Sequence, residues 1–202
     1  PGTIRRELEI PREAPVIGTV TRLAEQKRLD RLLKMMAVLP PSVHCLIAGE
    51  GDLGDDLQAQ SRALEVDHRV RFLGFRDDVG DILDALDLYV ITSDKEGMSN
   101  AMLEALAAGV PVVSTAVSGA AEALDPLPDG RRPGWVVDRR VEELARAVGR
   151  ALGDRYGLDE AGGAARRRWK SRFSFDSMVD AWETMLGGET NSSVHQGPSP
   201  LE

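Results

Sequence analysis

The stretch DLYVITSDKEGMSNAMLEALAAGVPVVST, residues 87–115, decides the fold because it contains a strand, a helix and a second strand in succession. The runs DLYVIT and PVVST are apolar without alternation, which is typical of strands buried on both faces of a parallel sheet. Ser99 or Asn100 can cap the helix between them, and Gly109 followed by Pro111 ends it. The stretch therefore predicts a strand–helix–strand unit with a right-handed crossover.

The same alternation extends through the rest of the chain. Four further apolar runs have the pattern of buried strands: VIGTV (16–20), VHCLIAG (43–49), RVRFLG (69–74) and GWVV (134–137). Helical patterns occupy 29–36, 55–65, 78–86, 141–152, 159–170 and 174–186. The alternation predicts an α/β fold, a Rossmann-like three-layer αβα domain with a six-stranded parallel sheet and additional C-terminal helices.

Composition and charge limit the kinds of ligand. The chain has 202 residues, 42% of them hydrophobic, a net charge of −8 and an isoelectric point near 5.0. An acidic protein of this kind lacks the field that attracts nucleic acid or an anionic membrane, so we predict no nucleic-acid partner. No apolar run approaches the roughly 20 residues of a membrane span. Any anionic ligand must therefore be held by a local basic site.

The two ends predict a domain organisation. Residues 1–15 (PGTIRRELEIPREAP) are polar and predict a linker remnant from a missing N-terminal domain, without a secretory signal. Residues 16–186 form one ligand-binding domain, and residues 187–202 a disordered tail whose final Leu-Glu resembles a cloning scar. Cys45 is the only cysteine and lies in an apolar run, which suits a buried thiol in the reducing cytoplasm.

A glycine pattern raises the alternative of a dinucleotide site. GEGDLG places Gly49, Gly51 and Gly54 after a strand and before a helix, as in the fingerprint of NAD-dependent Rossmann oxidoreductases. Glu50 and Asp52 in the same loop would repel a pyrophosphate. A tight turn and close helix–strand packing explain the three glycines without a ligand. We keep the oxidoreductase as the weaker alternative.

Two glutamates in the opening stretch indicate a ligand with two polar ends. In parallel sheets, ligands bind beyond the carboxyl ends of the strands, where Glu96 precedes a helix and Glu104 lies two turns into it. The helix N-terminus attracts phosphate, whereas carboxylates accept hydrogen bonds from sugar hydroxyls. A helical rise of about 1.5 Å per residue allows the two acids to lie on the order of 10 Å apart. A nucleotide sugar, with ribose, diphosphate and hexose, fits this arrangement.

The diphosphate of such a ligand needs more positive charge than one helix end supplies. Arg22 and Lys27 lie in the loop after the first predicted strand, at the same edge of the sheet. Arginine can bind two phosphate oxygens at once, and lysine adds a point charge. The sequence contains no D-x-D motif and no cluster of acids and histidines at ligand spacing, so we predict no metal and no cofactor.

Three segments together resemble one known family. These are V-x-x-L-x-x-x-K at 20–27, FLGFRDD, and EGMSNAMLEALAAGVPVVS, whose E-x7-E motif with the trailing A-x-G-x-P-V-V is the most specific part. They resemble the carboxyl-terminal, donor-binding half of GT-B glycosyltransferases of family GT4, over roughly residues 12–186. The family usually has a glycine directly after the lysine, and this chain has Arg28 there.

The resemblance implies a role for each site residue. Glu96 would contact the hydroxyls of the donor sugar, and Glu104 would contact the ribose. Arg22 and Lys27 would neutralise the leaving diphosphate, so Arg22, Lys27 and Glu96 are the predicted catalytic residues. Backbone groups complete the predicted donor site, at Gly97, Met98, Ser99 and Asn100 for sugar and diphosphate and at Phe75 and Arg76 for the base.

By the same resemblance, the chain is one half of a retaining hexosyltransferase. The complete enzyme would move a hexose-type sugar from a nucleotide diphosphate sugar to a glycan or lipid-linked acceptor, as in bacterial polysaccharide biosynthesis. The acceptor would bind the missing N-terminal domain, so this half alone is expected to be inactive. A non-catalytic nucleotide-sugar-binding module is a further alternative. The complete enzyme is expected in the cytoplasm, with peripheral association at the inner face of the membrane.

The last predicted helix, FSFDSMVDAWETML (173–186), leaves two interpretations open. In many family members this helix crosses back to the other domain, which would leave Trp182 and Met185 exposed in this chain. Alternatively, both side chains pack on the preceding helices.

Overall fold

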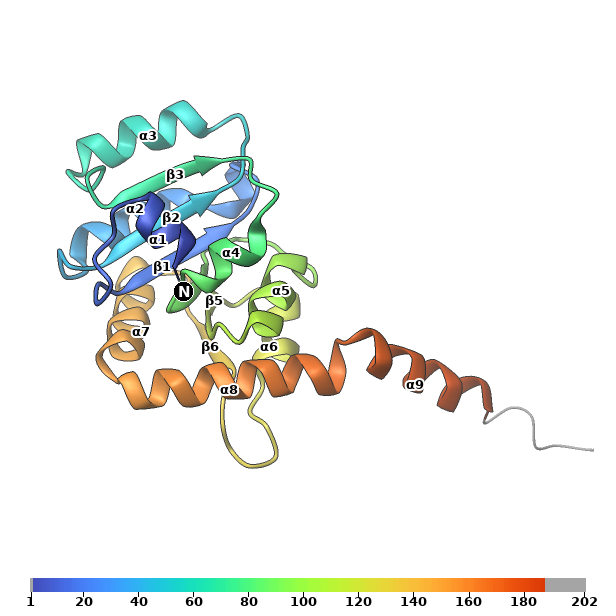
Figure 1. The fold of residues 1–202 in the computed structure, drawn as a ribbon. Helices are drawn as coiled ribbons and strands as arrows, with labels where there is room; N and C mark the ends of the chain where they lie inside the picture. Colours follow the sequence, from blue (N-terminus) through green and yellow to red (C-terminus); the bar gives the residue numbers. More distant parts are fainter. Residues whose placement is uncertain (1, 188–202) are drawn as a thin grey trace, which may run out of the picture.

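Six parallel strands form the centre of the domain, as predicted. The computed structural model describes residues 2–187 (Figure 1). The strands are β1 (Val16–Val20), β2 (His44–Ala48), β3 (Val70–Gly74), β4 (Leu88–Ile91), β5 (Val112–Thr115) and β6 (Gly134–Val137). Their order is β3-β2-β1-β4-β5-β6, and each neighbouring pair is parallel. The chain changes direction across the sheet between β1 and β4, which is the switch point where such sheets bind ligands.

Helices cover both faces of the sheet. They are α1 (Thr3–Glu7), α2 (Leu29–Val38), α3 (Gly54–Ala63), α4 (Val79–Asp84), α5 (Asn100–Ala108), α6 (Ser118–Leu124), α7 (Val141–Gly153), α8 (Arg155–Arg172) and α9 (Phe175–Gly187). A short 3-10 helix at Glu25–Lys27 precedes α2. The helices α2, α3 and α7 cover one face, while α1, α4, α5 and α6 cover the other (Figure 1). The three-layer αβα prediction is confirmed.

Two buried clusters explain why the strand sequences are apolar without alternation. In β1, the fully buried Val16 packs into the cluster that contains α5, and the fully buried Ile17 packs into the cluster that contains α2. Successive side chains of a strand point to opposite faces, so a strand covered on both sides needs apolar residues at every position. Cys45 is fully buried in β2, as predicted, and burial raises the pKa of its thiol to about 12.

Three features differ from the predicted elements. The helix α6 was not predicted, because its seven residues, SGAAEAL, are too few to display an amphipathic period. The helix α8 begins at Arg155 rather than at residue 159, and Asp154 caps it by accepting a hydrogen bond from the Gly157 amide. The segment predicted as a linker, residues 1–15, contains the helix α1.

The segment that contains α1 packs on the domain through a buried arginine. The Arg5 guanidinium donates to the carbonyl oxygens of Ala85 and Ala14 at 2.8 and 3.0 Å. It also pairs with a carboxylate oxygen of Asp87 at 2.8 Å. Ile4 is buried in the same cluster as α4. Residues 3–14 are therefore part of the packed domain, and their connection to a preceding domain stays a prediction.

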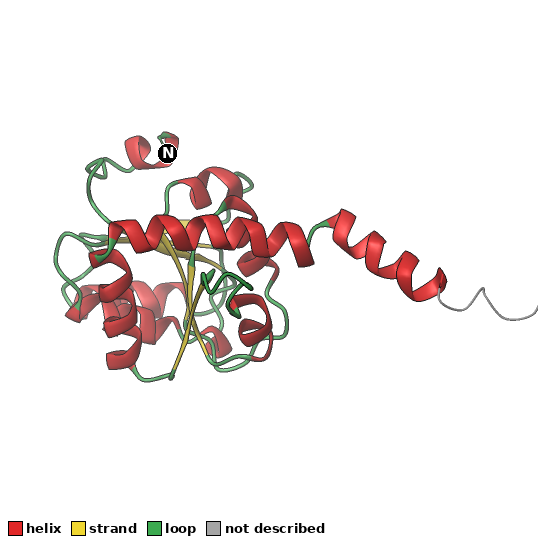
Figure 2. Ribbon diagram, turned by 90° about the horizontal axis from the view of Figure 1, so that it is seen from below, coloured by secondary structure: helices red, strands yellow, loops and turns green. Residues whose placement is uncertain are grey.

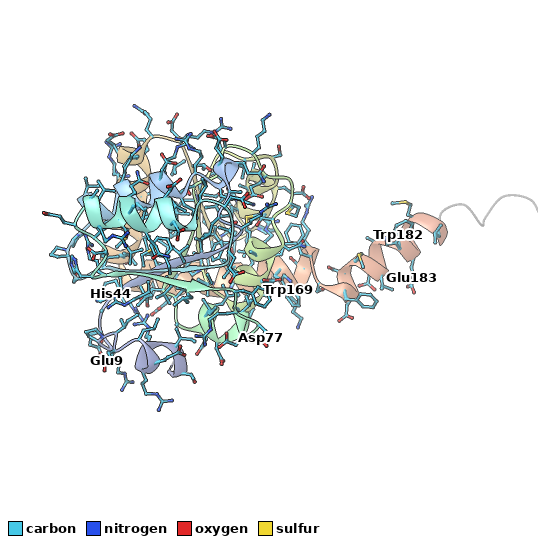
Figure 3. All side chains as sticks on the ribbon, turned by 90° about the horizontal axis from the view of Figure 1, so that it is seen from above. Glu9, His44, Asp77, Trp169, Trp182 and Glu183 are labelled. Carbon is cyan, nitrogen blue, oxygen red and sulfur yellow. The ribbon has the colours of Figure 1, made fainter. Side chains whose placement is uncertain are left out.

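The two last helices differ in how they contact the domain. The helix α8 runs along the sheet domain and packs closely on the end of α5, whereas α9 extends away from it (Figure 2). Trp182 and Met185 on α9 are 58% and 67% exposed, so the interpretation that they pack on the preceding helices is wrong. Figure 3 shows Trp182 and Glu183 well away from the sheet. The predicted disordered tail lies, apart from Gly187, outside the described residues.

Within residues 2–187, no helix combines the length and the apolar character that crossing a bilayer requires.

Candidate functional site

Two loops meet at the switch point of the sheet. β1 pairs with β4, so the loop after β1 (21–28) lies beside the loop after β4 (92–99). The Thr92 hydroxyl donates to the Lys27 carbonyl oxygen at 2.8 Å, and the Asp94 amide donates to the Gln26 carbonyl oxygen at 2.9 Å. The strand order therefore brings together two predicted site segments that are far apart in the sequence.

Lys27 and Glu96 form an ion pair at the centre of these loops. The ammonium nitrogen of Lys27 lies 2.5 Å from Oε1 of Glu96, and the Ser93 hydroxyl donates to the same oxygen at 2.9 Å. The side chains are only 15% and 13% exposed. A charged group that is largely shielded from water needs a partner of opposite charge, and Lys27 and Glu96 are partners of each other. The pair places the predicted phosphate-binding cation directly beside the predicted sugar-binding acid.

The N-terminus of α5 lies next to this pair. Ser99 is the N-cap residue, and its hydroxyl accepts a hydrogen bond from the Met102 amide at 3.4 Å. The sequence left Ser99 and Asn100 open as caps, and the structure identifies Ser99. Gly97, Met98 and Asn100 are exposed. Their backbone is accessible to a ligand at the positive end of the helix.

Gly119 fixes the position of the loop that leads into α5. A Cβ atom on this buried residue would lie 2.6 Å from the Gly97 carbonyl oxygen and 2.8 Å from the Met98 Cα atom. Only glycine permits such a close approach of two backbones. Gly119 was not predicted to shape the site, because the short helix α6 that contains it was not predicted. A glycine that follows a strand was the available signal.

Glu104 is exposed on α5, and its carboxylate has no protein partner in the described part of the chain. Among residues 2–187, no side chain forms a hydrogen bond or an ion pair with its carboxylate. Of the two glutamates, Glu96 is therefore paired with a lysine, and Glu104 is free to accept hydrogen bonds from a ligand. An ionised carboxylate is an acceptor only, which suits the hydroxyls of a ribose.

Tyr89 lies beneath the site and was not predicted. Its buried hydroxyl donates to the Val20 carbonyl oxygen at 3.0 Å and accepts from the Val20 amide at 3.1 Å. Burial raises the pKa of Tyr89 to about 12, and the charges of Glu96 and Glu104 act in the same direction. The phenol therefore stays neutral and ties the end of β1 to β4.

Arg22 lies at the same edge but outside the Lys27–Glu96 pair. Its guanidinium is 3.8 Å from the Asp52 carboxylate, and the two side chains are 71% and 93% exposed. An exposed pair of this kind contributes little to stability. Arg22 can therefore exchange Asp52 for a phosphate group without a large loss.

Phe75 and Arg76 follow β3 at this edge. Phe75 is 75% exposed. The Arg76 guanidinium forms ion pairs with Glu7 and Asp78, each at 2.6 Å, so its side chain is already occupied. This is compatible with the expectation that backbone groups of these two residues, rather than their side chains, contact a base.

The glycines of GEGDLG pack against the loop after β1. A Cβ atom on Gly49 would lie 2.0 Å from the Thr21 carbonyl oxygen, and one on Gly51 would lie 2.4 Å from the Leu23 carbonyl oxygen. The backbone of Gly49 also has a φ of +125°. Close packing of two loops therefore accounts for these glycines, and no dinucleotide is needed to explain them.

We expect Gly51→Ala to lower the free energy of unfolding by about 2–4 kcal/mol, because its Cβ would collide with the backbone of Leu23. Urea denaturation followed by circular dichroism measures this change. Gly54→Ala is the matched control, since its Cβ would meet only a Leu23 methyl group at 3.7 Å, and we expect a change below about 1 kcal/mol. NAD binding by the unaltered chain, lost with either substitution, would contradict this explanation.

The open space near the site lies on one side of Glu96. A groove of about 510 Å³ is lined by Gln26, Asp94, Lys95, Glu96, Gly97, Ala116, Val117, Ser118 and Arg139. A larger hollow of about 900 Å³ includes Pro15, Asp87 and Pro111, which precede β1, β4 and β5. It therefore lies at the opposite edge of the sheet, away from the loops that follow the strands. In the described part of the chain, no three His, Cys, Asp or Glu side chains are grouped so that they could hold a metal ion.

Known proteins share both the sequence and the fold of this chain. Residues 2–171 match the family model described as "Glycosyl transferases group 1". The chain is 32% identical over 186 residues to the lipopolysaccharide core biosynthesis glycosyltransferase LpsE of Rhizobium meliloti, which covers 92% of this chain and 53% of LpsE. The crystal structure of Anabaena HepE in complex with UDP superposes with a TM-score of 0.82 at 26% identity, covering 92% of this chain and 51% of HepE.

A second solved structure is also similar to this chain over about half of its own length. WaaG, a glycosyltransferase involved in lipopolysaccharide biosynthesis, superposes with a TM-score of 0.76 at 25% identity and covers 91% of this chain and 50% of WaaG. HepE was also crystallised with UDP and glucose and with UDP-glucose. The chain spans about half the length of each of these relatives.

Proposed function

Because the chain belongs to the glycosyl transferases group 1 family, GT4, we propose that it is the donor-binding half of a retaining glycosyltransferase that uses a UDP-sugar. The complete enzyme transfers a hexose-type sugar to a glycan or a lipid-linked acceptor. UDP is the proposed nucleotide because HepE, at 26% identity, was crystallised with UDP and with UDP-glucose. LpsE and WaaG are both named for lipopolysaccharide biosynthesis, which supports an acceptor of this class.

One observation carries the proposal: the half-buried Lys27–Glu96 pair lies beside the capped N-terminus of α5 at the switch point of the sheet. The helix end and Lys27 can hold a diphosphate, while Glu96 can accept hydrogen bonds from the hydroxyls of the sugar. Glu104, on the same helix, remains free for the ribose. The four groups match a ligand with an anionic centre and hydroxyls at both ends.

The proposed chemistry is electrostatic. When the bond between sugar and diphosphate breaks, negative charge grows on the leaving UDP. Lys27, Arg22 and the amides at the N-terminus of α5 stabilise that charge more strongly than they stabilise the intact donor. Glu96 orients the sugar through its hydroxyls, and the acceptor hydroxyl is supplied from the other half of the enzyme. The chain on its own should therefore bind the donor and transfer nothing.

A second candidate is a nucleotide-sugar-binding module without catalytic activity. It is compatible with the same site residues, because a fold and a binding site do not by themselves establish catalysis. Assaying transfer from UDP-glucose after the other half is added, in one chain or as a separate one, distinguishes the two candidates. We propose the cytoplasm as the location, which the single buried cysteine fits.

Calorimetric titration of the chain with UDP, GDP, ADP and NAD tests the donor site. We expect UDP to bind, NAD not to bind, and Glu104→Ala to weaken UDP binding by at least about tenfold, because a hydrogen bond to a charged group contributes about 1.5–3 kcal/mol. Glu183→Ala is the control, since Glu183 lies on α9 away from the sheet (Figure 3) and should leave the affinity unchanged. Binding of NAD in place of nucleoside diphosphates would favour an oxidoreductase.

A further inference from the structure

Arg28 holds an unusual backbone conformation directly after Lys27. It has a φ of 50° and a ψ of 45°, in the left-handed region, and it precedes the first residue of α2. Residues other than glycine seldom adopt this conformation. The cost of this conformation must be offset by other interactions, and the Arg28 side chain supplies several hydrogen bonds.

The Arg28 guanidinium joins the two loops of the site. It donates to both carboxylate oxygens of Asp30, at 2.9 and 3.1 Å, and to Oδ2 of Asp94 at 2.9 Å. The other oxygen of Asp94 pairs with Arg31 at 2.7 Å. Asp94 thus binds two arginines that follow Lys27, and Asp94 itself lies two residues before Glu96.

Arg31 adds a further contact between the loops. Its guanidinium donates to the Thr92 carbonyl oxygen at 3.0 Å, and its side chain is only 14% exposed. The hydrogen bonds from Arg28 and Arg31 lower the pKa of the Asp94 carboxyl group, so it is ionised at neutral pH. We call Arg28, Arg31 and Asp94 the arginine clamp.

We propose that Asp94 is a positioning residue, which fixes Lys27 relative to Glu96 through the arginine clamp. The inference rests on the proposed function, because it assigns the clamp to the donor site of that function. Outside the clamp, the loops that carry Lys27 and Glu96 are joined by the hydrogen bonds from the Thr92 hydroxyl to the Lys27 carbonyl oxygen and from the Asp94 amide to the Gln26 carbonyl oxygen. Holding the phosphate-binding and sugar-binding groups at one spacing before the donor arrives reduces the entropy lost on binding.

A purely structural role for the clamp makes a different prediction. A structural ion-pair network would change thermal stability, and its effect on UDP affinity would not depend on Lys27. A positioning network acts through Lys27, so its effect should vanish once the Lys27 ammonium group is removed. A double-mutant cycle measures this dependence.

The test compares UDP affinity by calorimetry in four forms of the chain: unaltered, Asp94→Asn, Lys27→Ala and the double variant. We expect Asp94→Asn to weaken UDP binding about fivefold in the unaltered background and less than twofold in the Lys27→Ala background. Asp129→Asn is the matched control, because Asp129 likewise pairs with two arginines, Arg131 and Arg167, but lies in the segment before β6, at the opposite edge of the sheet from the donor site. We expect it to change the affinity less than twofold.

A second variant and a second measurement complete the test. Arg28→Gly should keep the fold, because glycine adopts the left-handed conformation without strain, and should weaken UDP binding about threefold. The NMR signal of the Lys27 ammonium group should be protected from exchange in the unaltered chain and lost in Asp94→Asn. Equal effects of Asp94→Asn in both backgrounds, or an unchanged Lys27 signal, would overturn the inference. Absence of UDP binding by the unaltered chain would instead reject the proposed function, and the Lys27 signal would then decide on the clamp.

Discussion

Lys27→Ala in the complete enzyme is expected to lower kcat by about 100- to 1000-fold while weakening the binding of UDP-glucose by no more than about tenfold. Removing one group that stabilises developing charge has effects of this size in other enzymes. The ammonium group is only 15% exposed and is held beside Glu96 at 2.5 Å, so little reorganisation is needed when charge appears on the diphosphate. In the proposed ground-state complex, Arg22 and the N-terminus of α5 would share the binding of the diphosphate with Lys27, so the loss of affinity should be smaller than the loss of kcat.

Single-turnover kinetics at saturating UDP-glucose, together with calorimetry, separate the two effects of this substitution. Lys170→Ala is a suitable control, because Lys170 is exposed on α8 and lines the hollow at the opposite edge of the sheet. We expect the control to retain full activity. Equal losses of affinity and turnover in Lys27→Ala would mean that Lys27 binds the donor and the transition state alike, and would contradict its catalytic role.

The main elements of the fold could be predicted because each depends on a local pattern. VIGTV, DLYVIT and PVVST are apolar without alternation because β1, β4 and β5 are covered on both faces. The helices α1 and α6 have five and seven residues, and such short helices depend on tertiary contacts rather than on a periodic pattern. For α1, the decisive contacts join Arg5 to Ala85 and Asp87, about 80 residues away, which no local pattern could indicate.

The candidate site could be predicted in its residues but not in its connections. The E-x7-E motif identified Glu96 and Glu104, and the loop after the first strand identified Lys27. The ion pair of Lys27 with Glu96 depends on β1 lying next to β4, which is a property of the strand order rather than of either segment. The pairing of Arg22 with Asp52 likewise depends on how the loops after β1 and β2 pack, and neither local pattern indicates it.

The ion pair of Lys27 with Glu96 also affects which ligand binds most tightly. A diphosphate bound beside Lys27 competes with Glu96 for the charge of the ammonium group, which weakens the pairing of that 13% exposed carboxylate and leaves the Ser93 hydroxyl as its other partner. An unpaired, partly buried charge is unfavourable. The hydroxyls of a donor sugar replace the lost partner, whereas UDP alone does not. The pair should therefore favour the intact donor over the product UDP.

Glu96→Gln tests this argument directly in the isolated chain. Without an ion pair to break, and without repulsion between a carboxylate and the diphosphate, UDP should bind about tenfold more tightly. Glutamine accepts weaker hydrogen bonds from the sugar than a carboxylate does. The factor by which the sugar improves the affinity of UDP-glucose over that of UDP should therefore be about tenfold smaller. The gain for UDP is shared by the UDP part of UDP-glucose, so the ratio of the Kd for UDP to the Kd for UDP-glucose is expected to fall by about tenfold.

Glu104→Gln is the matched control for this ratio. It changes a carboxylate on the same helix to the same amide, but the ribose that Glu104 is proposed to bind is common to UDP and UDP-glucose. Both affinities should fall together, and their ratio should stay within a factor of two. If Glu96→Gln instead weakened both ligands equally, Glu96 would act on the nucleotide or on the loop itself, and its assignment to the donor sugar would be wrong.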